Sequence, residues 1–244
     1  MGIKKILITG ATKGLGLECV KFYLKKNYKI IATGRNDKYL KNFSNKIIFI
    51  KGDFLKKKDR NNFYKRISKI KNIDAVIHCM GGGLGYRDPL IKLENFIDLF
   101  MLNLGVASEI NSKINGNLNP KSSYIVHIGS TASSEAIGSV GYNSIKAAIV
   151  AYVKSLAISL IEKKIYVSCI LPGAFIAPGN AFERLKLNNK KIFLEFKNKR
   201  LPRKKIAKAS ELMPILNILT SNKGEMLAGS SITIDAGETK SYNL

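Results

Sequence analysis

Apolar residues along the chain fall into two patterns, short continuous runs and longer segments with helical spacing. The continuous runs lie at residues 6–9, 28–33, 47–51, 74–78, 124–128, 166–171 and 231–235. Short uninterrupted apolar runs that end at turn residues are typical of strands buried on both faces. We therefore expect a sheet of about seven buried strands, whose connections decide whether it is parallel.

Segments with helical spacing separate these runs. They lie at about residues 17–24, 56–70, 93–104, 142–162 and 210–220. Strands that alternate with helices predict an α/β fold, in which a doubly wound parallel sheet carries helices on both faces. At 244 residues, and without a linker-like stretch, the chain is expected to form one domain over residues 1–244.

The segment 142–162 is apolar on more than one face of its predicted helix. Its apolar residues are Ile145, Ile149, Val150, Val153, Leu156, Ile158 and Leu160. A single sheet cannot cover all of them, so we expect a second copy of the chain to do so. The sequence thus predicts a homodimer or homotetramer.

The first strand runs into a glycine-rich turn, Thr9–Gly16, and then a helix. Glycines there let the backbone turn tightly and approach a pyrophosphate, whose charge a helix N-terminus stabilises. The arrangement predicts a dinucleotide site rather than an ordinary tight turn. Its candidate binding residues are Gly10, Thr12, Lys13, Gly14, Leu15 and Gly16.

The end of the second strand bears on which dinucleotide binds. An acidic residue at this place binds the 2′-hydroxyl of NAD, whereas an arginine accommodates the 2′-phosphate of NADP. The chain has Gly34 followed by Arg35, and Lys13 is available from the first turn. We therefore expect NADP(H) to be favoured over NAD(H).

Further candidate cofactor contacts follow the third and fourth strands. Asp53 and Phe54 come after the third strand, where Asp53 either accepts a hydrogen bond from adenine or caps the next helix. Cys79 and Gly81 open a glycine-dense loop after the fourth strand. Such glycine density suits close approach of the backbone to a ligand.

Tyr142 and Lys146 stand four residues apart at the start of the long apolar helix. That spacing places both side chains on one face, one turn apart. An ammonium beside a phenol favours the phenolate, which equips a tyrosine to exchange a proton with an alcohol or carbonyl. Ser130, at the end of the preceding strand, would supply a second hydroxyl. The alternatives are a core tyrosine, a solvated lysine and a serine bonded to local backbone.

Together these residues resemble the short-chain dehydrogenase/reductase family over essentially the whole chain. The matching motifs are Thr9-Gly10-x3-Gly14-x-Gly16, Asn103, Ser130, Tyr142-x3-Lys146, Pro172-Gly173 and Asp235-Ala236-Gly237. The resemblance implies a Rossmann-type domain with an NAD(P)-dependent oxidoreductase activity, and Pro172 and Gly173 as cofactor contacts.

The resemblance also implies a role for each catalytic candidate. Tyr142 would be the general acid/base, while Lys146 would stabilise its phenolate and bind the nicotinamide ribose. Ser130 would orient the substrate carbonyl, and Asn103 would hold a water of the proton relay. For Asn103 the alternative is a buried helix amide.

The chain departs from the family pattern in three places. The usual Asn-Asn-Ala-Gly is here His78-Cys79-Met80-Gly81, and the threonine usual after Pro-Gly is Ala177. The stretch between Ser130 and Tyr142 is one residue shorter than is common. These changes bear on cofactor geometry and substrate more than on the class of reaction.

Composition adds charge and location. The formal net charge is +24, but the basic residues are spread along the chain and not interleaved with aromatics, so nucleic-acid binding is not expected. The chain has no run of about 18 apolar residues, so a membrane span is not expected. The 3 cysteines match no disulfide or metal spacing, and the N-terminus shows no signal-peptide pattern. We expect a cytoplasmic protein without a metal site.

A basic, weakly periodic segment at about residues 178–208 would cover the substrate. With Arg87 it carries the cations Arg184, Lys186, Lys190 and Lys191. The hypothesis is thus an NADPH-dependent oxidoreductase that transfers hydride between nicotinamide and a polar carbonyl or secondary alcohol, such as a sugar or sugar-nucleotide intermediate of surface carbohydrate synthesis. The alternatives are a 3-oxoacyl-thioester (acyl carrier protein) reductase and a catalytically silent NAD(P)-binding regulatory protein.

Overall fold

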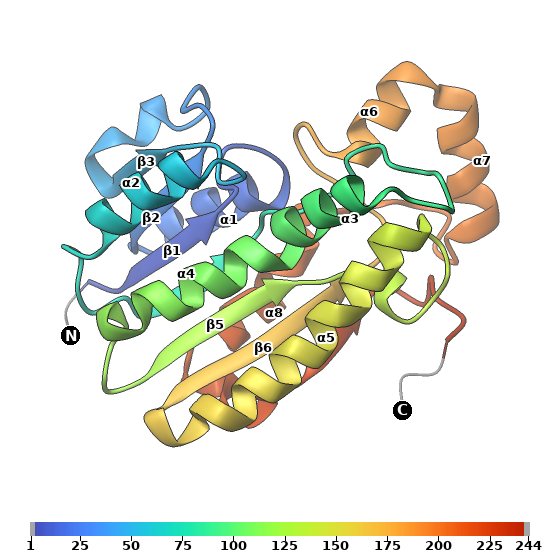
Figure 1. Ribbon diagram of the computed structural model, residues 1–244. Helices are drawn as coiled ribbons and strands as arrows, with labels where there is room; N and C mark the ends of the chain where they lie inside the picture. The colour runs from blue at the N-terminus through green and yellow to red at the C-terminus, as the bar shows by residue number, and fades with distance from the viewer. Residues whose placement is uncertain (1–2, 242–244) are drawn as a thin grey trace.

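A seven-stranded sheet in which every pairing is parallel runs through the molecule in the order β3-β2-β1-β4-β5-β6-β9 (Figure 1). The computed structural model describes residues 3–241, apart from the side chains of residues 41, 42 and 44. The strands are β1 Lys5–Thr9, β2 Lys29–Gly34, β3 Ile47–Lys51, β4 Ala75–His78, β5 Ser123–Ile128, β6 Ile165–Pro172 and β9 Ser231–Ile234. The predicted doubly wound α/β fold is confirmed.

Helices cover both faces of this sheet, because each strand is apolar on both sides. They are α1 Gly14–Lys25, α2 Lys57–Ile67, α3 Leu93–Phe100, α4 Val106–Ile114, α5 Val140–Leu160 and α8 Met213–Leu219. One core cluster includes Phe63 of α2, Ile110 of α4 and Ile149 of α5. The other includes Val20 of α1 and Leu216 of α8. In Figure 1, α4 and α5 cross in front of the sheet and α8 lies behind it.

Short helical turns complete the connections. They are η1 Lys41–Lys46, η3 Asn115–Asn117, η4 Thr131–Ser133, η5 Ile161–Lys163, η6 Ala209–Leu212 and η7 Asn222–Leu227. A π-helical turn, η2 Met101–Gly105, joins α3 to α4, so this helical segment extends beyond the predicted end near residue 104 to Ile114. Single π turns inside helices are frequent at functional sites.

The strand order reverses between β1 and β4, which fixes where a ligand can bind. The chain moves from β1 outwards to β3 and then returns to place β4 beside β1, with Thr9 opposite His78. In open parallel sheets, ligands bind outside the carboxyl ends of the strands at such a point. The glycine-rich turn after β1 and the loop after β4 meet there.

The basic segment is helical. It forms α6 Ala181–Asn188 and α7 Lys190–Arg200, and the short strands β7 Phe175–Ile176 and β8 Ala207–Lys208 pair at its base. Asn180 and Asn189 cap the two helices with their side-chain oxygens. The helical period is weak in the sequence because α7 buries Phe193 while α6 keeps all its described residues at least partly exposed. Figure 1 shows both helices beyond the carboxyl ends of the strands.

One helix among residues 3–241 is long and apolar enough to span a membrane, Val140–Lys163. This segment contains α5, which packs Ile145, Ile149 and Val153 into the core beside the sheet. It also buries the charged Lys146. The segment meets the length and composition criteria of a membrane span, and in this fold it contains the long helix that packs against the sheet.

Candidate active site

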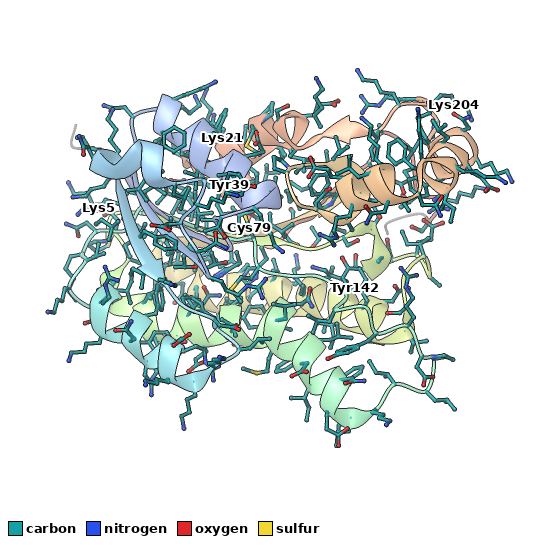
Figure 2. The ribbon with its side chains drawn as sticks, turned by 90° about the horizontal axis from the view of Figure 1, so that it is seen from above. Lys5, Lys21, Tyr39, Cys79, Tyr142 and Lys204 are labelled. Carbon is teal, nitrogen blue, oxygen red and sulfur yellow. The ribbon has the colours of Figure 1, made fainter. Side chains whose placement is uncertain are left out.

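Tyr142 and Lys146 lie in the first two turns of α5, at the carboxyl edge of the sheet. Lys146 is only 3% exposed, and its Nζ donates a hydrogen bond to the Ile128 carbonyl at 3.1 Å. The same Nζ lies 5.5 Å from the centre of the Tyr142 ring. In Figure 2, Tyr142 and Cys79 lie inside the outline of the molecule, whereas Lys5 and Lys204 stand near opposite ends. The structure thus joins phenol and ammonium as the spacing predicts.

Ser130 follows β5 and heads the turn η4, which packs against α5. Its Oγ accepts a hydrogen bond from the Ala132 N–H at 3.1 Å. This is the local backbone bond that the alternative interpretation foresaw. A hydroxyl oxygen that accepts a backbone N–H still has its own proton to donate. The side chain is thereby oriented without losing its donor.

Asn103 stands in the π-helical turn, buried to 5% exposure. Its amide bonds both backbone groups of Gly82 at 3.0 Å and the Leu99 carbonyl at 2.9 Å. A Cβ on Gly81 would lie 2.9 Å from Asn103 Oδ1 and 3.5 Å from Lys146 Nζ. Asn103 therefore holds the glycine-dense loop beside Lys146, and its role in a proton relay stays a prediction.

The glycine-rich turn fits a dinucleotide phosphate. Gly10 and Gly14 have φ of +62° and +58°, a region that favours glycine. A Cβ on Gly16 would lie 2.3 Å from the Gly10 carbonyl oxygen, and one on Gly34 would lie 2.4 Å from Thr12. The space beside Gly14 is open to 4 Å. Leu15 follows in the buried first turn of α1. Only glycines allow this close contact of turn, helix and second strand.

Three cations converge on this turn. Burial lowers the pKa of Lys13, and the charges of Arg35 and Arg184 lower it further. Arg184 of α6 donates to the Gly179 carbonyl, and a Cβ on Gly179 would lie 3.6 Å from that of Lys13. Repulsion among neighbouring cations marks a place that would favour an anion. Arg184 was predicted for the substrate, and its place beside the turn was not.

The remaining cofactor candidates differ in what their side chains contact. Asp53 accepts the Leu55 N–H at 3.3 Å, while α2 begins after Lys56, so Asp53 does not act as its N-cap. The Phe54 ring is buried against Phe63, with centroids 5.0 Å apart.

Cys79, Pro172 and Gly173 lie at the ends of neighbouring parts of the sheet edge. Cys79 follows β4 and is partly exposed, and its carbonyl lies 3.2 Å from the place of a Cβ on Gly10. Pro172 ends β6, and Gly173 follows it. The loops that would contact a dinucleotide therefore meet at one edge.

His78 stands where the family has the first asparagine of its motif, and it belongs to a buried polar network. His78 Nε2 lies 2.8 Å from Asn111 Oδ1, so His78 donates, and Asn111 Nδ2 lies 3.3 Å from His127 Nε2. Asn111 Nδ2 also donates to the Tyr152 hydroxyl. Burial lowers the pKa of His78 to about 4 and that of His127 well below its ordinary value. Both imidazoles are therefore neutral near pH 7.

Comparison with known proteins shows the family to which the chain belongs. The family model described as short chain dehydrogenase matches residues 4–187. The chain is 26% identical to rat dehydrogenase/reductase SDR family member 6, over 96% of both chains. It is 27% identical to the 3-oxoacyl-[acyl-carrier-protein] reductase FabG of Buchnera aphidicola, again over 96% of both.

Solved structures agree in fold. L-Sorbose reductase from Gluconobacter frateurii, complexed with NADPH and L-sorbose, superimposes with a TM-score of 0.87 at 22% identity over 99% of both chains. YwfH, an NADPH dependent reductase involved in bacilysin biosynthesis, gives a TM-score of 0.85 at 18% identity, over 99% of this chain and 100% of the other.

Proposed function

Since the chain belongs to the short-chain dehydrogenase family and is an oxidoreductase, we propose that it is an NADPH-dependent reductase of a polar, anionic carbonyl compound. One observation carries the proposal. The pair Tyr142 and Lys146 shares the carboxyl edge of the sheet with a glycine-rich turn on which Lys13, Arg35 and Arg184 converge. A phenol set for proton transfer thus faces a site suited to a phosphorylated dinucleotide.

The residues of the chain divide the chemistry among themselves. The glycine-rich turn, Lys146 and the Pro172–Gly173 loop would hold the dinucleotide, which would supply the hydride for the carbonyl carbon. Tyr142 donates its phenolic proton to the carbonyl oxygen as negative charge develops there, and the Lys146 ammonium stabilises the phenolate left behind. Ser130 donates a hydrogen bond to the same oxygen and so orients the carbonyl. Asn103 keeps the glycine-dense loop in place beside Lys146.

Selectivity for NADPH would come from the three cations of the turn. A 2′-phosphate beside Lys13 and Arg35 would receive charge-assisted hydrogen bonds, which are roughly twice as strong as neutral ones. Arg184 adds a third positive charge from α6. NADH offers only a neutral 2′-hydroxyl there, so with that cofactor the mutual repulsion of the cations would remain.

The substrate would lie under the helices α6 and α7. We take these helices as the predicted cover at about residues 178–208, within a single domain. Phe182 and Phe196 pair across the two helices with centroids 5.1 Å apart, which ties the cover together. Residues 1–2 and 242–244 of the domain range lie outside the described residues. The basic residues of the cover favour an anionic substrate, such as a sugar phosphate or sugar nucleotide.

A 3-oxoacyl thioester is the second candidate, because the chain is 27% identical to an acyl-carrier-protein reductase over 96% of its length. Its carrier protein would supply the negative charge that the cover attracts. The silent regulatory alternative is less favoured, because Ser130, Tyr142 and Lys146 are all present, and a protein that only binds the nucleotide has no need of all three.

We propose that two copies pair through α5 and α3. Ile158 and Val140 of α5 are 68% and 52% exposed, and Leu93 and Ile97 of α3 are 70% and 49% exposed. Large apolar side chains exposed on two helices that contact each other favour an interface. A second copy of the chain fits best, because it offers the same apolar face in return.

We also propose a cytoplasmic location without nucleic-acid binding. The described cysteines Cys19, Cys79 and Cys169 are free thiols, as a reducing compartment favours. Lysine side chains project outwards around the molecule instead of forming one basic face (Figure 2).

Binding and turnover test the proposal separately. Calorimetric titration should give a dissociation constant for NADPH at least about tenfold below that for NADH, the equivalent of about 1.4 kcal/mol. Turnover with keto-sugar phosphates, keto-sugar nucleotides and acetoacetyl thioesters then identifies the substrate class. NADPH binding without turnover of any of them would favour the silent regulatory protein, and equal affinity for both cofactors would refute the role of the cations.

A further inference from the structure

Arg200, at the end of α7, contacts carboxylates from two distant parts of the chain. Its Nη2 lies 2.5 Å from Glu135 Oε2, and its Nε lies 3.8 Å from Glu238 Oε1. The side chains of Arg200, Glu135 and Glu238 are 24%, 18% and 5% exposed. Ion pairs this sheltered are weakly screened by salt, so they transmit position between the segments that carry them.

Glu238 connects this arginine to the loop after β6. Its Oε2 accepts the Ala174 N–H at 2.5 Å in a buried hydrogen bond. A Cβ on Gly173 would lie 2.5 Å from the same oxygen, so the carboxylate packs directly against the backbone. Pro172 and Gly173 are expected cofactor contacts. The carboxylate therefore fixes the backbone of a predicted cofactor loop.

Glu135 connects Arg200 to the two catalytic hydroxyls. It follows η4, the turn that Ser130 heads. The Glu135 carbonyl accepts a hydrogen bond from Asn143 Nδ2 at 3.2 Å, and Asn143 is the neighbour of Tyr142. Asn143 Oδ1 in turn accepts the Gly138 N–H at 3.0 Å. The segment between Ser130 and Tyr142 is thus bonded to itself and to Arg200.

We propose that Arg200 is a positioning residue of the reductase, which through Glu135 and Glu238 holds the Ser130 turn and the Pro172–Ala174 loop in one geometry under the α6–α7 cover. The inference rests on the proposed function for its kinetic consequences. It goes beyond that function, because it links the cover to both sides of the reacting centre.

The charge on Glu238 does not serve stability. Burial raises the pKa of Glu238, and Asp235 and Glu135 raise it further, against the opposing effects of the Ala174 N–H and Arg200. The ionised carboxylate therefore costs folding free energy on balance near neutral pH. A glutamine would keep the acceptor for Ala174 and remove that cost. The negative charge of Glu238 is instead needed for the ion pair that holds Arg200.

The test compares Glu238→Gln, Arg200→Gln and Arg200→Lys with the wild type. Lys199→Gln is the matched control, because the neighbouring Lys199 makes only an exposed pair with Glu195 and is 78% exposed. We expect Glu238→Gln and Arg200→Gln to lower kcat for carbonyl reduction about tenfold to a hundredfold, as a misplaced reacting group does. Arg200→Lys should recover part of the loss, and Lys199→Gln should match the wild type.

Three further readouts separate positioning from folding and from cofactor binding. The melting temperature of Glu238→Gln should equal or exceed that of the wild type, and the NADPH dissociation constant should stay within about twofold. Hydrogen exchange should quicken over residues 130–138 and 172–176 in Arg200→Gln, whether or not a substrate is known.

These readouts also tell two failures apart. A wild type that neither binds NADPH nor reduces carbonyls would refute the proposed function. The hydrogen-exchange data would still test whether Arg200 holds the two segments in place. Unchanged exchange in Arg200→Gln, or unchanged kcat in both glutamine variants of an active enzyme, would overturn the inference.

Discussion

Acid should unfold the protein through its buried histidines, and the effect is large enough to measure. His78 is 3% exposed and donates to Asn111, and its pKa is lowered to about 4 from an ordinary 6.5. Burial is the main cause, because a charged imidazole would lose its hydration. The folded state therefore keeps His78 neutral where the unfolded chain already binds a proton.

The sign and size of the effect follow from linkage. A histidine with a depressed pKa in the folded state costs stability as the pH falls from 6.5 towards 4, since the unfolded state binds more protons there. Between pH 7 and pH 5 that difference amounts to about 2 kcal/mol for His78. His127, whose pKa is also lowered, acts in the same direction.

Urea unfolding of the wild type and of His78→Gln, at pH 7 and at pH 5, isolates this contribution. Glutamine keeps a donor for Asn111 but does not titrate. The wild type should lose about 2 kcal/mol more than His78→Gln over this interval, whatever the stability of each at pH 7. Equal losses in the two proteins would show that His78 charges freely in the folded state, which would refute the buried network.

Two further changes test other parts of the account. Arg35→Ala should raise the dissociation constant of NADPH about tenfold and leave that of NADH within about twofold, because the proposed site would bring only a 2′-phosphate to that cation. Calorimetry measures both constants, with Lys38→Ala as the control, and parallel weakening for both cofactors would contradict the prediction. Ile158→Glu, at a position 68% exposed, should convert a dimer or tetramer into monomers in sedimentation without lowering the melting temperature of the fold; an unchanged mass would place the interface elsewhere.

Most of the fold could be predicted from local sequence pattern, because strands and helices depend largely on the residues within each segment. Each buried strand is a short apolar run that ends at a turn, and the spacing of Tyr142 and Lys146 on one helix face needs no tertiary information. The glycine-rich turn was equally readable, since Gly10 and Gly16 meet a steric need that other residues cannot fulfil.

Features that depend on distant contacts were not predictable. The α6–α7 helices bury few side chains, so their apolar period is faint. The π turn at Asn103 continues a helix that the apolar spacing ends near residue 104. Arg184 meets Lys13 only through the folding of the cover. Arg200 and Glu135 are 65 residues apart in sequence, and the residues around each give no indication that the two side chains pair. The pairing of His78 with His127 follows from strand register alone.

Single-turnover reduction by Tyr142→Phe, with NADPH already bound, tests most directly the claim that Tyr142 delivers the proton. Removing only the hydroxyl should slow the chemical step by about a hundredfold to ten-thousandfold while NADPH affinity and melting temperature stay unchanged. A Tyr142→Phe protein that reduces its substrate as fast as the wild type would contradict the account.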